Sequence, residues 1–528
     1  MNDGSLLVRR LEVSASEQEA VVDVSWSRRL LGLPLLFTLA LAIMAVRADA
    51  TEGRVRESFW GAATLLLLWN AGLAVDVVAR GRQLAVNVVV RKQHYLQACA
   101  QGAVLLYWGY YWREVYGSVH LIAAQLLFAY AFDMLLAWSL RGTYTLGFAP
   151  FPVIFSINLF LWFKAEWFYL QFLLVAVGLA AKELIRWEKE GRRVHVFNPS
   201  SFPLGLFALA LILSGTTDLT WGQEIAATLN NAPSIYLLIF LVALPGQLLF
   251  GVTTMTMAAV VTMYLLGLLY FAATGTYYFI DSYIPIAVFL GMHLLFTDPS
   301  TAPRTDLGRV LFGALYATSV VVLYYVLGRL GAPTFYDKLL AVPVMNLTIK
   351  AIDRLATGPL RRLDPDGLTR RRGDRRRHLA YMGVWTIVFV VLSAVQAVGD
   401  THRGQRVTFW LKACEENRPN GCRQAGVLTS AYCRAGSGWA CNEYGILVQP
   451  AIRPEVAGRA FQRACDLGFA SGCQNLDLGA ATGPKRAAPE IHDYRLLLQG
   501  RKGPLPTLTP QQLRQRACEQ EFVDACGP

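Results

Sequence analysis

Cysteine is almost absent from the first 413 residues of this 528-residue chain, where Cys99 is the only one. The other eight cysteines lie in the last 115 residues, in pairs whose partners are separated by seven residues. The pairs are Cys414/Cys422, Cys433/Cys441, Cys465/Cys473 and Cys518/Cys526. This distribution divides the chain into a hydrophobic body and a polar tail that disulfides can staple.

Several common catalytic and cofactor motifs are also missing. The chain contains no phosphate-binding P-loop, no HExxH motif and no C-x-x-C-H haem-attachment site, which argues against a hydrolase or kinase of the soluble type. Seven intervening residues are too many for the usual zinc knuckle, so we expect no metal site. No cleavable signal peptide is recognisable, because the first apolar run follows a polar leader of 29 residues.

The composition is that of a membrane protein. Hydrophobic residues make up 54% of the chain, and the mean hydropathy of +0.36 lies outside the range of ordinary soluble proteins. Apolar runs of about 17–25 residues, long enough to cross a bilayer, recur along the body. We expect about thirteen spans, at 30–47, 58–79, 95–112, 118–140, 146–163, 166–186, 203–215, 232–250, 252–273, 277–297, 308–330, 335–352 and 380–398.

The predicted fold class is therefore all-α. A polytopic transmembrane helical bundle is followed by a small extracytoplasmic helical-repeat domain. The expected parts are a cytoplasmic leader at 1–29, the main bundle at 30–352, a basic cytoplasmic loop at 353–379, the last span at 380–398 and the tail at 400–528.

The net charge of +12 does not indicate nucleic acid, because the basic residues occur in short segments between expected spans. Such segments mark the cytoplasmic side of a membrane. They are Arg28 and Arg29; Arg80, Arg82, Arg91 and Lys92; Arg186, Lys189, Arg192 and Arg193; and eight arginines from Arg361 to Arg377. The last group could also bind RNA or an anionic lipid headgroup. Thirteen spans put all four groups inside and the tail outside, where cysteines oxidise. We expect a multi-pass protein of the bacterial cytoplasmic membrane with a cytoplasmic N-terminus and a periplasmic tail.

The tail repeats one pattern around each cysteine pair. Apolar residues recur at steps of three and four before the first cysteine, as in VAGRAFQRACDLG at 456–468, which predicts a helix, a tight turn and a second helix. The uniform spacing favours a bridge within each pair, and such a bridge clamps an αα-hairpin that buries little surface alone. The pattern resembles cysteine-rich Sel-type repeats, which are related to tetratricopeptide repeats. Such repeats bind a partner or cell-wall material; alternatively, the tail is only a stapled cap.

The repeats are unevenly spaced along the tail. Successive first cysteines are 19, 32 and 53 residues apart, which argues against a continuous solenoid groove. The stretch 474–510 contains GPKRAAPE and GPLPTLTP, so we expect a loop or linker there.

Three segments of the body differ from ordinary hydrophobic sequence. Residues 192–205 contain Asn198-Pro199, and residues 244–257 contain Pro245, Gly246 and Gly251 within an apolar run. Residues 293–309 contain Thr297-Asp298-Pro299. Broken helices at membrane depth are tolerated only where protein or a cavity satisfies the freed backbone groups.

Residues 190–350 resemble the membrane family that contains the D subunit of the Rnf electron-transport complex and the B subunit of the sodium-pumping NADH:quinone reductase. The similarity is carried by Phe197-Asn198-Pro199, by Thr297-Asp298-Pro299 with Thr301 and Pro303, and by Leu307-Gly308-Arg309. It implies a flavin mononucleotide (FMN) on a threonine. Thr217, in Ser214-Gly215-Thr216-Thr217, matches the acceptor position, and Thr253, Thr254, Thr256 and Asn198 are candidate flavin contacts. Alternatively, this segment is simply a helix end with Gly215 at the cap and Asp218 or Thr220 capping the next helix.

Ionisable residues within spans are costly and point to function or to pairing. The candidates are Asp133, Asp281, His293 and Asp298. Asp133 is predicted either to relay protons or cations or to pair with another residue of the bundle.

Three functions remain open at this stage. In the first, a flavin-bearing subunit passes electrons alongside other electron-transport subunits. In the second, the broken helices and Asp133 form a cofactor-free path for an ion or small molecule. In the third, the body anchors a tail that recruits an envelope protein.

Overall fold

The computed structural model describes residues 20–26, 28–48, 53–189, 191–280, 282–363, 375–448, 453–478, 484–499 and 508–526. The chain separates into two compact units. The body unit comprises residues 1–229, 236–262 and 286–388, and the tail unit comprises 230–235, 263–285 and 389–528. Both units are mostly helical, as predicted.

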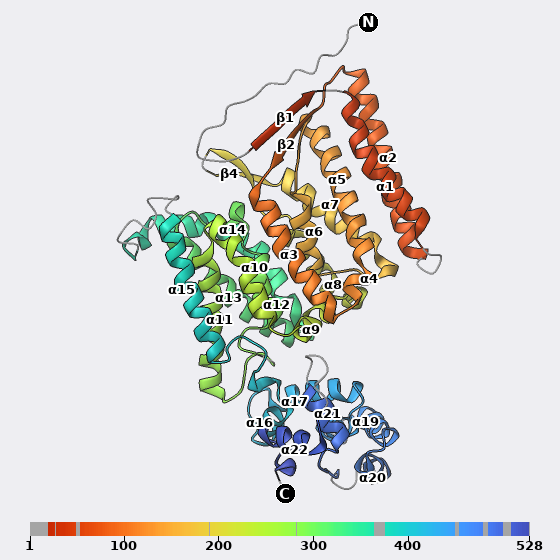
Figure 1. Ribbon diagram of the computed structural model, residues 1–528, viewed down its shortest axis with the longest axis vertical. Helices are drawn as coiled ribbons and strands as arrows, with labels where there is room; N and C mark the ends of the chain where they lie inside the picture. The colour runs from red at the N-terminus through yellow and green to blue at the C-terminus, as the bar shows by residue number, and fades with distance from the viewer. Residues whose placement is uncertain are drawn as a thin grey trace. The chain divides into compact units, whose positions relative to one another are not determined.

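The first fifteen helices are named here by their bounds (Figure 1). They are α1 Gly32–Arg47, α2 Gly53–Ala79, α3 Lys92–Tyr111, α4 Glu114–Gly117, α5 Val119–Arg141, α6 Pro150–Asn158, α7 Tyr169–Leu184, α8 Ser201–Ser214, α9 Gly222–Thr228, α10 Ile235–Phe250, α11 Thr253–Thr274, α12 Ile286–Leu294, α13 Asp306–Arg329, α14 Asp337–Thr357 and α15 Arg375–Ala394.

Within the described residues, five helices are long and apolar enough to cross a membrane: α2, α5, α11, α13 and α15. They coincide with the predicted spans at 58–79, 118–140, 252–273, 308–330 and 380–398. A sixth candidate combines residues 222–231 with α10 across a bend of 101°. The total of thirteen spans is not confirmed. The helix α1 has 16 residues and α8 has 14, so each is short for a span.

Two predicted spans are not continuous helices. Within 146–163 only the nine residues of α6 form an α-helix, and within 277–297 only the nine residues of α12 do. Pro150 and Pro285 stand at the starts of these helices, where a proline is tolerated but cannot continue a preceding helix. Both α6 and α12 are therefore half-helices, too short to cross a bilayer alone.

The end of α6 is held by buried side-chain amides. Asn158 Nδ2 donates hydrogen bonds to the Ile154 carbonyl at 2.7 Å and to Gln125 Oε1 at 2.9 Å. Gln171 Nε2 also donates to Gln125 Oε1, at 3.1 Å, while its own Oε1 accepts from the Phe163 backbone N–H. These amides satisfy backbone groups that the helix break frees, as membrane depth requires.

The sequence analysis missed five short strands. They are β1 Ala20–Trp26, β2 Ala85–Val90, β3 Thr143–Leu146, β4 Arg186–Lys189 and β5 Arg192–His195. Strand β2 pairs antiparallel with β1 and parallel with β3, and β4 pairs antiparallel with β5. In the chain, β2, β3 and β4 come shortly after α2, α5 and α7, and β2 and β4 lie at one end of these helices (Figure 1). The connection from α2 to β2 carries Arg80 and Arg82, and β4 begins at Arg186.

Close packing fills the core of the body unit. Trp108, Trp138 and Phe312 are fully buried. The helix α13 approaches α11 so closely at Gly313 that a Cβ there would lie 2.2 Å from the Met255 carbonyl oxygen. Cys99 lies on the exposed face of α3 and is a free thiol.

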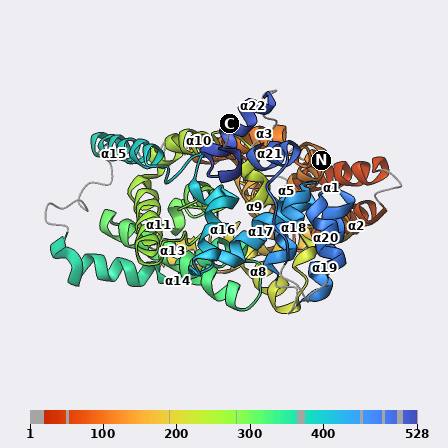
Figure 2. The ribbon, with the colours of Figure 1, turned by 90° about the horizontal axis from the view of Figure 1, so that it is seen from below.

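In the tail unit, seven further helices follow. They are α16 Val407–Glu415, α17 Gly421–Arg434, α18 Gly438–Leu447, α19 Pro454–Asp466, α20 Ala470–Leu478, α21 Ile491–Gln499 and α22 Pro510–Glu519. A short 3-10 helix, η11 Val523–Ala525, comes after α22. Each helix from α16 to α19 packs on the next (Figure 2).

All four predicted disulfide pairs are confirmed, with Cα–Cα distances of 4.3–4.8 Å. The bridges are Cys414–Cys422, Cys433–Cys441, Cys465–Cys473 and Cys518–Cys526. The first three join the end of one helix to the early part of the next, as the hairpin prediction requires. Cys473, for example, lies in the second turn of α20, opposite Cys465 near the end of α19.

The last pair departs from the predicted hairpin. Cys518 lies near the end of α22, but Cys526 directly follows the three residues of η11 and is not in a helix. The expectation of a second helix in this unit is therefore wrong. Because residues 523–526 form only one 3-10 turn, this bridge fixes a helix to a turn rather than to another helix.

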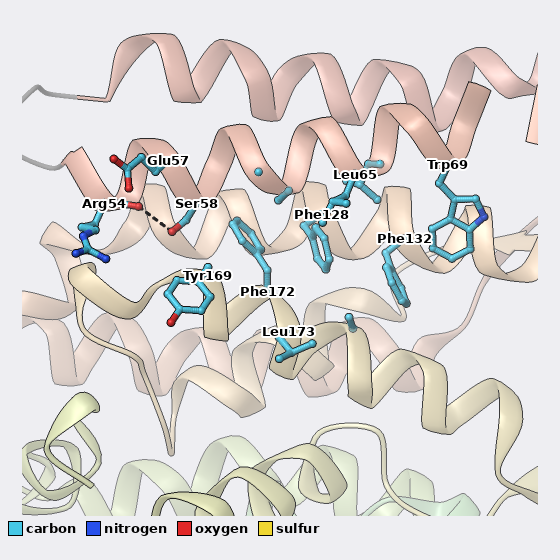
Figure 3. A pocket seen from close by; sticks show the side chains of 14 residues that line it. Arg54, Glu57, Ser58, Leu65, Trp69, Phe128, Phe132, Tyr169, Phe172 and Leu173 are labelled. Atoms are coloured by element: carbon cyan, nitrogen blue, oxygen red, sulfur yellow. Dashed lines mark hydrogen bonds between the residues drawn. The ribbon is translucent and has the colours of Figure 1, made fainter. Parts of the chain in front are cut away.

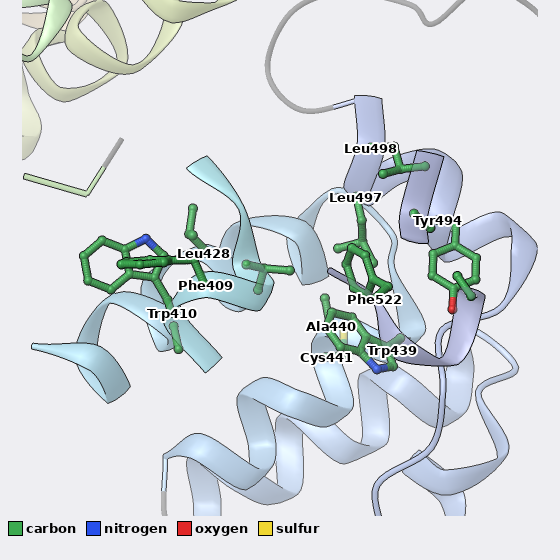
Figure 4. Close-up of a cluster of buried hydrophobic side chains, with 14 of the residues drawn as sticks. Phe409, Trp410, Leu428, Trp439, Ala440, Cys441, Tyr494, Leu497, Leu498 and Phe522 are labelled. Carbon is green, nitrogen blue, oxygen red and sulfur yellow. The ribbon is translucent and has the colours of Figure 1, made fainter. Parts of the chain in front are cut away.

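Part of the expected linker belongs to the core of the tail. The helix α21 lies within 474–510 yet buries Tyr494 and Leu497 beside Trp439 and Phe522 (Figure 4). The buried carboxylate of Asp493 accepts hydrogen bonds from Ser437 Oγ at 2.6 Å and from the Trp439 backbone N–H at 3.2 Å. It thus joins α21 to the N-terminus of α18. The rest of the expected linker lies partly outside the described residues, at 479–483 and 500–507.

The loop between α16 and α17 is hydrogen-bonded to residues 263–285, which belong to the same unit. Asn420 Nδ2 donates to Tyr270 Oη at 3.0 Å, and Arg418 Nη1 donates to the Gly275 carbonyl at 3.0 Å. Thr276 Oγ1 donates to the Pro419 carbonyl, also at 3.0 Å. The C-terminal part of α11 and the loop after it therefore hold the loop between α16 and α17 through directional contacts.

The buried Glu443 of α18 predicts a pH-dependent stability of the tail. Burial raises its pKa to about 7, although Arg486 Nε lies 3.3 Å away and lowers it. Because the pKa is raised in the folded state, the contribution of Glu443 to the stability of the tail is greatest below about pH 4.5 and is lost as the pH rises towards 7. The steepest slope is about 1.4 kcal/mol per pH unit.

Glu443→Gln keeps the shape of the side chain without its charge, and it should flatten this decline. The measurement is denaturant unfolding of the full-length protein between pH 4.5 and 8, followed by pulse proteolysis of the tail. Glu455→Gln replaces an exposed glutamate of α19 and should leave the native profile unchanged. A profile that is equally steep in Glu443→Gln and in the native protein would contradict the prediction.

Candidate functional site

The two motif loops of the body, which are 100 residues apart in the sequence, are joined by hydrogen bonds. Asn198 Nδ2 donates to the Leu295 carbonyl at 3.0 Å, just beyond the end of α12. Asn198 Oδ1 accepts from the backbone N–H groups of Ser200 at 2.9 Å and Ser201 at 3.1 Å, at the start of α8. One buried side chain therefore ties the end of a half-helix to the beginning of another helix.

A second connection runs between β5 and the loop after α12. His195 Nε2 lies 3.1 Å from Asp298 Oδ2, and Asp298 Oδ1 accepts from the Ser300 backbone N–H at 3.0 Å. Burial alone would raise the pKa of Asp298. The hydrogen bond and charge of His195, with hydrogen bonds from Ser300 and Thr301, lower the pKa below its usual value. Asp298 is thus positioned as an ionised brace of this loop.

Arg309 extends the same framework to the break between α10 and α11. Its guanidinium donates to the Pro303 carbonyl at 3.2 Å and to the Gly251 carbonyl at 2.6 Å, and it also contacts Asp306 at 3.2 Å. Gly251 has a φ of +64°, so the helix breaks there. Pro245, which we expected to interrupt the run, lies inside α10 instead.

A small polar cavity lies at the end of α12. It is bounded by α3, α10 and α12 and has a volume of about 10 Å³. His293, Gln247, Thr297 and Gln97 contribute the polar part of the lining. That volume is close to what one water molecule needs.

Several groups at this cavity lack a hydrogen-bond partner among the described residues. His293 Nδ1 donates to the Phe289 carbonyl at 2.7 Å, which leaves Nε2 as an acceptor without a partner. Both side-chain amide atoms of Gln247 are also without one. The two side chains are each only 2% exposed. Leaving such groups unpaired costs about 1–3 kcal/mol each, so a water molecule that pairs with them is strongly favoured.

Three further buried hydroxyls stand at the start of α11. The Oγ1 atoms of Thr253, Thr254 and Thr256 have no hydrogen-bond partner within the described part of the chain. These threonines follow Gly251 closely in the sequence and therefore lie on the side of the body where Arg309 and the motif loops meet.

Thr217 lies elsewhere. Asn198 precedes α8 and Ser214 ends it, and 14 helical residues separate the two ends by about 21 Å. Gly215 caps the end of α8 with a φ of +69°, as the alternative interpretation predicted. The helix α9 has no side-chain cap from Asp218 or Thr220. The predicted flavin contacts thus fall at two ends of the body and do not form one site.

The surroundings of Thr217 suit a covalent attachment point. Ser214 Oγ and Thr216 Oγ1 are 2.6 Å apart and occupied with each other, and Ser214 also donates to the Ala210 carbonyl at 2.8 Å. The half-buried Thr217 makes no side-chain hydrogen bond to any residue that the structure describes, so its hydroxyl is available. The Thr217 hydroxyl is thus open to the attachment that the resemblance implies, whereas the other predicted contacts lie at the opposite end of α8.

The intramembrane carboxylate Asp133 has a partner. Lys182 Nζ of α7 lies 2.9 Å from Asp133 Oδ1 and 3.0 Å from Oδ2. The pairing alternative is therefore confirmed, and the partner is a lysine. Asp281 lies outside the described residues.

The sequence analysis did not select Gln247, Gln101 or Lys182. Gln247 stands two residues after Pro245 in an otherwise apolar run, which is a recognisable signal of an intramembrane polar site. Gln101 Nε2 donates to the Leu294 carbonyl at 3.4 Å, a contact across 193 residues that no local pattern predicts. The described residues contain no group of three His, Cys, Asp or Glu side chains that could hold a metal ion.

No protein-family model, curated protein or solved structure matches this chain. The similarity to the Rnf and sodium-pumping reductase subunits therefore depends on the motif residues themselves. In the structure these residues serve mainly as braces: Asn198, Asp298 and Arg309 connect α8, α12 and the break between α10 and α11.

Proposed function

We propose that the chain is a membrane electron-transport subunit of the type found in Rnf and sodium-pumping NADH:quinone reductase complexes. The observation that supports this most directly is the hydrogen bonding of the two motif loops. Asn198 of the first loop bonds the end of α12, and Asp298 of the second bonds His195 beside the first. These motif residues are far apart in the sequence, yet they meet at a helix break. We would expect this if the motifs form the structural core that members of such a family have in common.

FMN is the proposed cofactor, with Thr217 as its attachment residue. FMN would supply the electron-carrying chemistry, and the chain would supply attachment and orientation. Ser214, Gly215 and Thr216 fold the end of α8 so that Thr217 Oγ1 remains available. The proposed site of attachment is thus at the opposite end of α8 from Asn198.

The proposed location is the bacterial cytoplasmic membrane, with the N-terminus inside and the tail in the periplasm. The arginine-rich connections between the body helices support a cytoplasmic N-terminus, because positively charged connections lie on the cytoplasmic side of a membrane. Four disulfides support an oxidising compartment for the tail. The tail would then recruit an envelope protein, while the body would contact other electron-transport subunits.

A second candidate function is the passage of a small polar solute or ion without a cofactor. The buried polar groups of His293 and Gln247 favour it, because they have no hydrogen-bond partner among the described residues and lie at the end of a half-helix. Binding sites of membrane transporters commonly occur at such helix breaks.

The flavin assignment predicts a clear difference between two neighbouring threonines. Thr217→Ala should abolish covalently bound flavin, because it removes the only proposed acceptor oxygen. Thr216→Ala should retain the flavin, because that hydroxyl is paired with Ser214. The measurement is in-gel flavin fluorescence of purified full-length protein after denaturation, at matched expression. Fluorescence that persists in Thr217→Ala would refute the attachment residue, and a colourless native protein would favour the transport function.

A further inference from the structure

A long groove runs along the outside of α2, α5 and α7, with a volume of about 640 Å³ (Figure 3). Its lining is almost entirely apolar, and Leu65 and Leu173 on its edges are 70% and 51% exposed. The helices α2 and α5 are both candidate membrane spans. The groove therefore opens towards the hydrocarbon region of the bilayer.

Aromatic rings that pack on one another form the walls. Phe128 contacts Phe132 at 5.5 Å and Phe172 at 4.9 Å between ring centroids, and Phe132 contacts Trp69 at 5.3 Å. Mutual stacking leaves these rings little freedom to move into the hollow. The groove is thus a preformed feature rather than a gap that side chains close.

The groove is long. Arg54 marks one end and Trp69 the other, and fifteen helical residues of α2 separate them by about 22 Å (Figure 3). An apolar hollow of this length that ends at two charged side chains suits an extended hydrocarbon chain with a charged headgroup.

One end of the groove carries a cation and an anion. Arg54 and Glu57 are separated by about one turn of α2, and neither makes an ion pair with any residue that the structure describes (Figure 3). The hydroxyl of Ser58 is already bonded to the Arg54 carbonyl at 2.8 Å, while the Tyr169 side chain lies at the same end. Two opposite charges at one end of an apolar groove complement a ligand that carries both charges and a hydrocarbon chain.

We propose that this groove binds one phospholipid with a zwitterionic headgroup that carries a primary ammonium, as phosphatidylethanolamine does. Arg54 contacts the phosphate, Glu57 accepts hydrogen bonds from the ammonium, and the hydrocarbon chain lies against Phe128, Phe132 and Phe172. Phosphatidylglycerol lacks the cation that Glu57 requires. A choline headgroup lacks N–H donors, so it pairs less well with Glu57.

The test uses native mass spectrometry of the delipidated full-length protein titrated with phosphatidylethanolamine or phosphatidylglycerol. Gly61→Leu places a larger side chain in the groove, and its Cβ meets nothing within 4 Å. Gly72→Leu is the matched control, because Gly72 lies on the same helix, outside the groove, with equal space around it.

Native protein should bind one phosphatidylethanolamine, and Gly61→Leu should weaken this binding at least tenfold while Gly72→Leu leaves it unchanged. Glu57→Gln should remove the preference for phosphatidylethanolamine over phosphatidylglycerol, and Arg54→Gln should weaken the binding of both. Equal lipid binding by native protein and Gly61→Leu would overturn the proposal. So would a Gly61→Leu variant that loses a protein partner or a dimer but keeps its lipid, because the groove would then hold a helix.

Discussion

Reduction of the four disulfides should unfold helices α16–α22 while the body unit stays folded. Each bridge closes a loop of about nine residues, and the loss of chain entropy in the unfolded state is worth about 2.5 kcal/mol per bridge, in a model-dependent treatment. Together the bridges contribute about 10 kcal/mol, comparable with the whole stability of an ordinary domain. The body unit has only the free thiol of Cys99 and loses nothing on reduction. Limited proteolysis with and without reductant should show cleavage confined to the tail.

Two of the bridges provide a matched comparison. Cys433–Cys441 and Cys414–Cys422 close loops of equal length, so the entropic effect of their removal is the same. Cys441 is fully buried in the tail core, whereas Cys422 is exposed. Replacing Cys433 and Cys441 by alanine should therefore destabilise the tail by about 1 kcal/mol more than replacing Cys414 and Cys422.

Equal losses of stability in the two double variants would show that burial of Cys441 adds nothing. A tail that resists proteolysis equally well under reducing conditions would contradict the assigned role of the bridges. Cys99→Ser serves as the control for thiol effects unrelated to the tail, and its proteolysis pattern should match that of the native protein.

Replacement of Lys182 by methionine should destabilise the body unit by roughly 3–5 kcal/mol. The Asp133 side chain is only 6% exposed and would lose the ammonium that contacts both of its oxygens. Asp133→Asn should cost less, about 1–3 kcal/mol, because the Lys182 side chain is 20% exposed and can extend its charged end away from the bundle. Denaturant titration of the detergent-solubilised protein measures both losses.

The double variant Asp133→Leu with Lys182→Met should recover most of the stability, because a buried ion pair can often be replaced by apolar side chains. Arg80→Gln is the control: its ion pair with Asp76 has an arginine that is 72% exposed, so the change should stay within about 0.5 kcal/mol. If Asp133→Asn cost more than Lys182→Met, the assigned difference in burial would be wrong.

Features that depend on short stretches of chain were predictable from the sequence. The four disulfide pairs follow from identical local spacing, and five of the long apolar runs became helices long enough to span a membrane. The cap at Gly215 follows from the residue itself, since glycine adopts positive φ without strain. In each case the relevant partners lie within a few turns of one another, and periodicity or spacing reports them.

The half-helices were only partly predictable. Proline and glycine suggested breaks near α10, but Pro245 lies inside that helix and the break falls at Gly251. The apolar runs at 146–163 and 277–297 concealed the short helices α6 and α12, because hydropathy does not distinguish a continuous span from a helix with a buried loop. Hydropathy reports burial in an apolar environment, and both arrangements provide it.

The sequence by itself determined the helical class, the cysteine pairing and the separation of a hydrophobic body from a stapled tail. Only the tertiary structure decided that Lys182 pairs with Asp133, that Asn198 bonds the end of α12, and that Gln247 and His293 face one cavity. The tertiary structure also shows that α21, in the expected linker, belongs to the tail core. Cys526 follows a 3-10 turn, where we expected a helix. These outcomes depend on which side chains come into contact after segments distant in the sequence have packed together. Such long-range contacts produce no periodic pattern in the sequence from which they could be predicted.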